Sequence, residues 1–86
     1  MLLFLQDLHG DSFDIPPKFD KLWVDNCPNF KTVPNHIFEL NIRNCAEFEQ
    51  VPSSVIKLDV YNCKSFKHVP KTVQTVRVGD CPLYKE

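Results

Sequence analysis

Residues 33–50 read VPNHIFELNIRNCAEFEQ, and residues 51–68 read VPSSVIKLDVYNCKSFKH. Both stretches begin with Val-Pro, carry a Leu-x-Ile/Val segment in the middle and place Asn-Cys and then Phe near the end. The same order of residues recurs in residues 15–32 and 69–86, so four units of 18 residues follow one another. A fixed period of this kind indicates a solenoid, in which each unit forms one coil and neighbouring coils share a continuous core.

Each position of the unit forms a column of similar residues. We predict that two columns build an inward-facing core ladder: Cys27, Cys45, Cys63 and Cys81, and three residues later Phe30, Phe48, Phe66 and Tyr84. The Leu-x-Ile/Val segment alternates apolar and polar residues, which is typical of a strand with one buried face. Proline has no N–H to donate to a sheet, so the Val-Pro column is expected on the return side of each coil.

These patterns predict a mainly β fold. We expect a short solenoid of about five parallel strands on the concave side, with an extended or polyproline-like convex side and little or no helix. The expected strands are residues 2–6, 21–25, 39–43, 57–61 and 75–79. A single domain spans residues 1–86, in which a degenerate N-terminal unit, 1–14, precedes the repeats 15–32, 33–50, 51–68 and 69–86. In that first unit Leu8 is expected to take the place of cysteine, and residues 9–12 make a longer loop.

The unit resembles the leucine-rich repeat family. The family pattern LxxLxLxxCxxL is matched by residues 37–48 and 55–66, and it recurs in residues 19–30 and 73–84. The VPxxVxxLxV run is similar to FNIP-type and bacterial-effector-type leucine-rich repeats. The unit of 18 residues is shorter than the roughly 20–29 residues usual in the family. The resemblance implies a curved, right-handed solenoid with a parallel sheet on its concave side, used mainly for protein–protein binding.

Composition and charge argue against several classes of partner. Ten Lys and Arg oppose eleven Asp and Glu, a net charge of -1 that attracts neither nucleic acid nor an anionic membrane. The longest apolar run, residues 1–5, is far shorter than the ~20 residues of a membrane span. Two glycines leave no Gly-rich phosphate loop. We therefore expect no nucleic-acid partner, no membrane partner and no cofactor.

The cysteines are expected to pack as small hydrophobic side chains. Disulfides and a zinc site are the alternatives, but zinc ligands usually come in close pairs such as CxxC, and no two cysteines here are closer than 18 residues. Four unpaired thiols predict the cytoplasm or another reducing intracellular compartment. His9, His36 and His68 fall in different columns, so no metal site, catalytic triad or enzyme activity is predicted.

Polar residues at the edges of the strands suggest how the register is held. The residue before each cysteine is Asn or Asp; a ligand array is one interpretation, but we expect these side chains to bond the local backbone where the strand turns. Charges at outward positions alternate in sign between neighbouring strands, which favours one register. The expected pairs are Lys21–Glu39, Glu39–Lys57, Asp25–Arg43 and Asp59–Arg77.

Apolar residues at outward positions predict an interface. Phe4 and Trp23 are expected to be adjacent on the concave face, and tryptophan is enriched among binding hot spots. The alternative is that these rings only fold over an end of the solenoid. The interface candidates are Leu3, Phe4, Trp23, Phe38, Ile56, Tyr61 and Arg77.

The leading functional prediction is a non-enzymatic protein–protein binding or scaffold module. Solenoid ends need a polar cap, and the terminal units here keep their apolar columns, so we expect self-association. The simplest form is a two-fold dimer through one end, with the N-terminal end favoured by Phe4 and Trp23. The alternative is a structural assembly subunit, for example a virion or filament component, that stacks through its solenoid ends.

Overall fold

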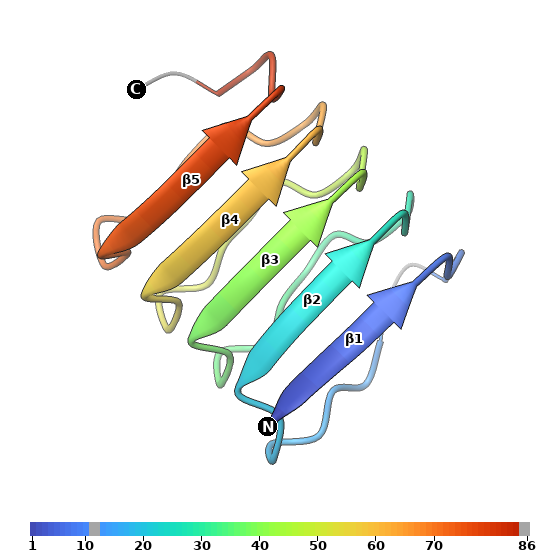
Figure 1. Ribbon diagram of the computed structural model, residues 1–86, viewed down its shortest axis with the longest axis vertical. Coiled ribbons are helices and arrows are strands. Elements are labelled where there is room, and N and C mark those ends of the chain that lie inside the picture. Colours follow the sequence, from blue (N-terminus) through green and yellow to red (C-terminus); the bar gives the residue numbers. More distant parts are fainter. Residues whose placement is uncertain (11–12, 85–86) are drawn as a thin grey trace.

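The chain folds into one sheet of five parallel strands. The computed structural model describes residues 1–10 and 13–84, and its strands follow the order β1-β2-β3-β4-β5 (Figure 1). Their bounds are β1 (Leu2–Gln6), β2 (Lys21–Asp25), β3 (Glu39–Arg43), β4 (Lys57–Tyr61) and β5 (Thr75–Gly79). The described residues contain no helix, and so none that is long and apolar enough to cross a membrane. The structure confirms the predicted β-solenoid and all five predicted strand ranges.

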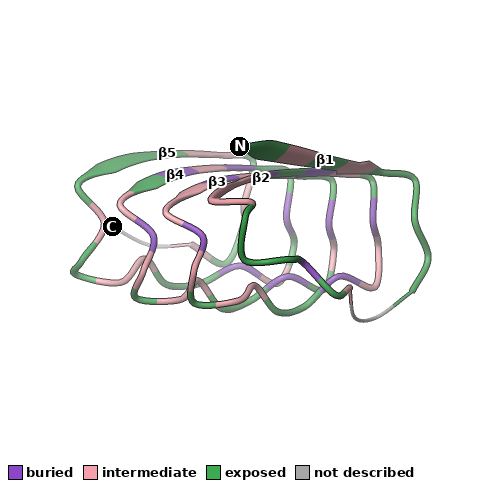
Figure 2. Cartoon of the chain, turned by 90° about the horizontal axis from the view of Figure 1, so that it is seen from below, coloured by how far each residue is buried: buried purple, intermediate pink, exposed green. Residues whose placement is uncertain are grey.

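The coils form two layers with the core between them. The sheet is one layer and the return segments are the other, and buried residues recur along both layers and in the segments that join them (Figure 2). The molecule measures 32 × 28 × 14 Å, so it is only two layers thick. Equivalent residues of successive coils lie side by side, as in the pairings of Leu22 with Leu40 and of Leu40 with Leu58. The 18-residue period therefore holds the strands in register.

Two tight turns close each coil. The N–H of Phe48 donates to the carbonyl of Cys45 at 3.3 Å, and the N–H of Ile37 donates to the carbonyl of Pro34 at 3.4 Å. Bonds from residue i+3 to residue i define β-turns. They explain why two pairs of columns are three residues apart, namely Cys with Phe and Pro with Val or Ile. The prolines begin the turns on the return side, as predicted, where their missing N–H costs no sheet bond.

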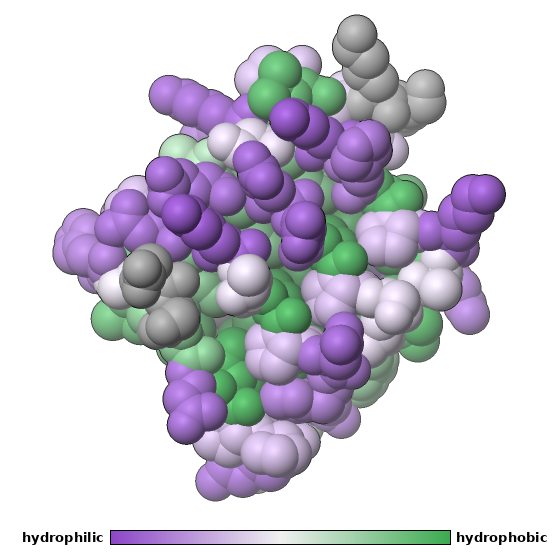
Figure 3. Space-filling view, turned by 180° about the vertical axis from the view of Figure 1, so that it is seen from behind, coloured by the Kyte–Doolittle hydropathy of each residue, from purple (hydrophilic) through white to green (hydrophobic). Residues whose placement is uncertain are grey.

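The return side is only partly polar. Seen from behind, hydrophobic surface shows between hydrophilic side chains (Figure 3). The valines before the prolines, Val33, Val51 and Val69, are half-buried and pack against the core. An extended return segment covers less of the core than a helix would, because it is thinner.

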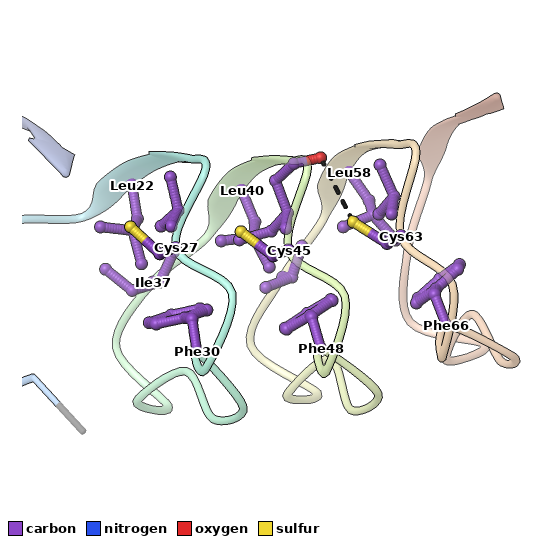
Figure 4. Packing of buried hydrophobic residues seen from close by; sticks show 14 of the residues in the cluster. Leu22, Cys27, Phe30, Ile37, Leu40, Cys45, Phe48, Leu58, Cys63 and Phe66 are labelled. Atoms are coloured by element: carbon purple, nitrogen blue, oxygen red, sulfur yellow. Dashed lines mark hydrogen bonds between the residues drawn. The ribbon is translucent and has the colours of Figure 1, made fainter. Parts of the chain in front are cut away.

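Aromatic rings and thiols fill the interior as two parallel stacks (Figure 4). Phe48 lies between Phe30 and Phe66, with ring centroids 6.1 and 6.0 Å away and the planes nearly parallel. All four cysteines are free, and their thiols also donate to nearby carbonyls, as in the 3.2 Å contact from Cys45 Sγ to the carbonyl of Arg43. The thiol column therefore fills space and also satisfies a carbonyl at the corner after each of β2, β3, β4 and β5.

The first and last coils are less buried than the interior coils. Leu8 is 38% exposed, so the prediction that it takes the place of a buried cysteine was wrong. Phe13, by contrast, stacks on Phe30 with ring centroids 5.6 Å apart. In the last coil Val76 is 43% exposed, and Cys81 and Tyr84 are only half-buried members of the core ladder. A solenoid coil is covered mainly by its neighbours, and an end coil has one on one side only. Part of the predicted long loop, residues 11–12, and residues 85–86 of the last repeat lie outside the described residues.

The Asn/Asp column occupies the left-handed region of backbone space. Asn26, Asn44 and Asn62 have φ values of 54°, 56° and 56°, and Asp7 and Asp80 have values of 59° and 52°. Asn and Asp tolerate this conformation better than other residues with a side chain. Among residues with a side chain, Asn and Asp therefore suit the backbone of the corner after each strand best.

The same side chains form an amide ladder along the solenoid. Asn62 Nδ2 donates to Asn44 Oδ1 at 2.7 Å, and Asn26 Nδ2 donates to Asp7 Oδ1 at 2.6 Å. Asn44 Nδ2 reaches the carboxylate of Asp25 at 3.0 Å. The prediction that these side chains bond the local backbone was wrong. Parallel coils bring like side chains to roughly 5 Å, where amides bond one another.

We expect Asn44→Ala to lower the free energy of unfolding by about 1–2 kcal/mol, because alanine is strained at positive φ and removes two ladder bonds. Asn44→Gly removes the same bonds without the strain and should cost less. Urea denaturation of the two variants and the wild type measures the difference. A glycine variant less stable than the alanine variant would contradict the backbone explanation.

Candidate functional site

A hollowed surface lies on the outer face of the sheet. A groove of about 660 Å³ crosses all five strands near their N-terminal ends, and we call it the sheet groove. Its outward side chains are Leu2, Lys21, Trp23, Glu39, Asn41, Lys57, Asp59, Thr75 and Arg77. Because strand residues alternate between the two faces, these side chains are free of the core. The groove therefore presents variable residues on an invariant scaffold.

One end of the sheet groove is apolar. Phe4 and Trp23 are paired in register, with ring centroids 5.4 Å apart and planes tilted by 46°. Phe4 is 51% exposed, Trp23 is 37% exposed, and Leu2 is also exposed beside them. We call Leu2, Phe4 and Trp23 the aromatic corner. Their adjacency on the outer face agrees with the prediction.

Arg43 covers part of the aromatic corner. Its guanidinium lies 5.8 Å from the centroid of the Trp23 ring, and its Nε donates to Asn41 Oδ1 at 3.3 Å. The predicted Asp25–Arg43 ion pair does not form, because Asp25 accepts from Asn44 and Arg43 turns toward the ring. A guanidinium over an indole face is a stabilising cation–π contact. It holds the indole in place on the exposed face.

The rest of the sheet groove carries charges of both signs. Lys57 Nζ lies 3.3 Å from Glu39 Oε1, the one ion pair between strands in the described part of the chain. Lys21 faces Glu39, and Asp59 faces Arg77, in the predicted register. Exposed pairs of this kind contribute little stability. The groove therefore has mixed charge and suits a polar partner of either sign.

The predicted interface residues fall into four places, and Tyr61 occupies the fourth. Trp23 and Arg77 line the sheet groove, and Phe4 lies beside it, packed against Trp23. Leu3 lies on the inner face of β1, half-buried against the core, so it is not an exposed interface residue. Phe38 and Ile56 precede β3 and β4, are half-buried, and are joined by a bond of 2.8 Å from the N–H of Ile56 to the carbonyl of Phe38.

Tyr61 lies at the other end of the strands, away from the sheet groove. Its ring covers Gly79, where a Cβ atom would come within 2.8 Å of Tyr61 Cδ2. A hydrogen bond to the Asp80 carboxylate and its charge raise the pKa of the Tyr61 hydroxyl above its ordinary value. Tyr61 is thus exposed but engaged with its own neighbouring coil.

Sequence reasoning missed the part that Arg43 and Leu2 take in the site. Trp23 faces Asn41 in register, so Arg43 is its diagonal neighbour two residues further along β3. Diagonal pairs lie within reach of long side chains, and this spacing was the available signal. Leu2 faces Lys21 and belongs to the outer face by simple alternation.

The described residues do not bring together groups suited to metal binding. No set of three or more His, Cys, Asp or Glu side chains lies close enough to hold a metal ion among residues 1–10 and 13–84. Cys27, Cys45 and Cys63 are buried and Cys81 is half-buried. Burial raises the pKa of the Cys63 thiol to about 12, which disfavours its reactive thiolate form.

Comparison with known proteins adds no relative. No protein-family model, no curated protein and no solved structure matches the chain. The resemblance to leucine-rich repeats therefore rests on the repeated residues of this sequence.

Proposed function

We propose that this chain is a non-enzymatic protein-binding module of the leucine-rich repeat type. Another protein would dock on the sheet groove, with the aromatic corner as its apolar anchor. The observation that carries the proposal is the exposed Trp23 ring, held between Phe4 and Arg43 at the edge of the groove. Aromatic residues and arginine are the side chains most enriched among interface hot spots.

The form of the groove supports a protein as the partner. It is open and crosses five strands, whereas small-molecule sites are deeper and enclose their ligands. Its mixed charges, Lys21, Lys57 and Arg77 with Glu39 and Asp59, can pair with the polar rim of a folded partner. In this proposal the module works in a reducing intracellular compartment, since its thiols are unpaired.

Capture of a partner from the native source tests the proposal. Trp23→Ala and Arg77→Glu should each reduce the amount of a captured protein at least tenfold, as expected for hot-spot and charge-reversal changes in an interface. His68→Ala, an exposed change on the return side, is the matched control and should leave capture unchanged. Equal capture by wild type, Trp23→Ala and Arg77→Glu would contradict the proposed surface.

A structural assembly subunit is the second candidate. Within the described residues β1 and β5 each pair with one neighbour only, and exposed apolar residues mark both ends, including Phe4 and Val76. Such edges can join copies of the chain into a larger object, such as a filament or a virion component. Solution mass by light scattering separates the two candidates, because open stacking gives a mass that keeps rising with concentration.

A further inference from the structure

The free edge of β1 has an unusual composition for an edge strand. Its five residues, LLFLQ, carry no charge and no proline, whereas protective edge strands usually carry lysine, proline or a bulge. Its outward side chains are Leu2, Phe4 and Gln6, all exposed. By contrast, β5 at the other edge carries Arg77. The β1 edge is therefore the one better suited to pairing with another strand.

The backbone of β1 determines which residues can pair. The carbonyl of Met1 accepts the N–H of Lys21 at 3.3 Å, so it points toward β2. Backbone groups alternate in direction along a strand, so the odd-numbered residues of β1 face β2 and the even-numbered residues face away. The N–H and C=O groups that point away from β2, toward the free edge of the sheet, belong to Leu2, Phe4 and Gln6. These three residues are symmetric about Phe4.

We propose that β1 pairs antiparallel with β1 of a second copy of this chain, around a two-fold axis at Phe4. This inference rests on the self-association expected for the proposed binding module and names its partner. Leu2 of one copy would face Gln6 of the other, and the two Phe4 residues would face each other. Every outward N–H and C=O group of the three residues then finds a partner across the axis. A ten-stranded sheet would result, with the groove of each copy left open beyond β1.

The side chains of β1 suit the same arrangement. The two Phe4 rings would meet on the outer face, each already packed against the Trp23 ring of its own copy. On the inner face Leu3 of one copy would meet Leu5 of the other, and both are half-buried in the present structure. The contact would cover the apolar end of the core that the first coil leaves exposed. A two-fold contact is closed, so assembly stops at two copies.

Head-to-tail stacking of β1 on β5 is opposed by charge. In the interior of the amide ladder, each side chain donates to an oxygen of the preceding coil, as Asn62 does to Asn44. A head-to-tail junction would place Asp7 of one copy after Asp80 of the other, at the same corner of adjacent coils. Two carboxylates there have no amide hydrogen to share and repel each other. In the antiparallel pair the two Asp7 residues are roughly 20 Å apart, six strand residues at ~3.3 Å each.

Cross-linking through the two-fold axis tests the geometry. Directly opposed residues of a hydrogen-bonded antiparallel pair have Cα atoms ~5.5 Å apart, within the range of a disulfide. Phe4→Cys should therefore give a covalent dimer on mild oxidation, whereas the wild type, whose thiols are buried or half-buried, should not. Gln6→Cys is the matched control, because the two Gln6 residues would lie roughly 13 Å apart. The proposal is overturned if Gln6→Cys cross-links as readily as Phe4→Cys, or if no covalent dimer forms.

A second pair of variants tests the backbone bonds without removing an apolar side chain. Gln6→Pro deletes an outward N–H and leaves the bonds between β1 and β2, and proline is tolerated at an edge strand when its N–H would face away. Sedimentation should show a wild-type dimer at tens of micromolar, with dimerisation at least tenfold weaker for Gln6→Pro than for Gln6→Ala. A monomeric wild type, or a mass above two copies, refutes the two-fold pairing. Partner capture by the groove, measured with Arg77→Glu, is a separate readout and decides the binding proposal on its own.

Discussion

Phe48→Ala should lower the free energy of unfolding by about 3–5 kcal/mol, a large share of the ~5–15 kcal/mol that stabilises a small domain. The ring is fully buried and stacks on both sides, with planes tilted by 18° from Phe30 and 8° from Phe66. Its removal leaves a cavity that two extended layers cannot close, because each coil is held in register by its neighbours. Urea denaturation followed by circular dichroism measures the loss.

Two variants provide the comparison for Phe48→Ala. Phe13→Ala removes a half-buried ring that stacks on Phe30 alone, so it should cost less. Asn41→Ala, on the outer face, removes one exposed acceptor of Arg43 and should change stability by no more than about 0.5 kcal/mol. If Phe48→Ala and Asn41→Ala denature at the same urea concentration, the inward and outward assignments are wrong.

The buried thiols should make the folded protein lose stability at alkaline pH. Burial raises the pKa of Cys45 from 9.0 to about 11 and the pKa of Cys63 from 9.0 to about 12. Below pH 9 both thiols are protonated in the folded and the unfolded chain, so their full contribution to stability is present. Between pH 9 and the folded pKa values only the unfolded chain releases the protons, and stability falls by up to about 1.4 kcal/mol per pH unit for each thiol.

Urea midpoints from pH 8 to pH 12 measure this effect, and the Cys45→Ala, Cys63→Ala double variant is the control. The rest of the chain is the same in both proteins, so the double variant should lose only the contribution of the two thiols and show a shallower decline. Parallel declines in the two proteins would show that the thiols ionise as easily in the folded state as in the unfolded state.

The same burial should suppress thiol chemistry at neutral pH. The thiolate is the reactive form, so a pKa of about 11 lowers the reactive fraction of Cys45 roughly 100-fold relative to a thiol at 9.0. A thiol reagent should modify the cysteines slowly in the native protein and rapidly in urea. A chelator should leave the melting temperature unchanged, since we predict packing and no zinc. Stoichiometric zinc, or a mass two hydrogens low, would contradict that prediction.

The fold was predictable because every coil repeats the same physical requirements. A residue such as Leu40 must be apolar because it points inward, and Pro34 must stand outside the sheet because it lacks an N–H. Four copies of each requirement, spaced by 18 residues, leave one register for the strands. The predicted ranges of all five strands were confirmed for this reason, and so was the adjacency of Phe4 and Trp23.

Contacts made by flexible side chains needed the tertiary structure. Arg43 could reach Asp25 directly across the strands or Trp23 on the diagonal, and these options differ by little free energy at an exposed site. The Asn44 side chain could bond its own backbone or a side chain of a neighbouring coil. The left-handed backbone at the corner and the distance between coils favour the bond to the neighbouring side chain. Column position also says nothing about how far an end coil is covered, so the exposure of Leu8 and Val76 appeared only in the folded chain.

The sequence by itself determined the period, the strands, the inward columns and the outer face, because a repeated hydrophobic pattern has few packings that bury it. The tertiary structure decided the path of the amide ladder, the position of Arg43 over the indole and the separation of Tyr61 from the sheet groove. These features depend on distances of a few ångströms between side chains of different coils. A one-dimensional pattern gives the order of those side chains, and only the folded solenoid sets the distances between them.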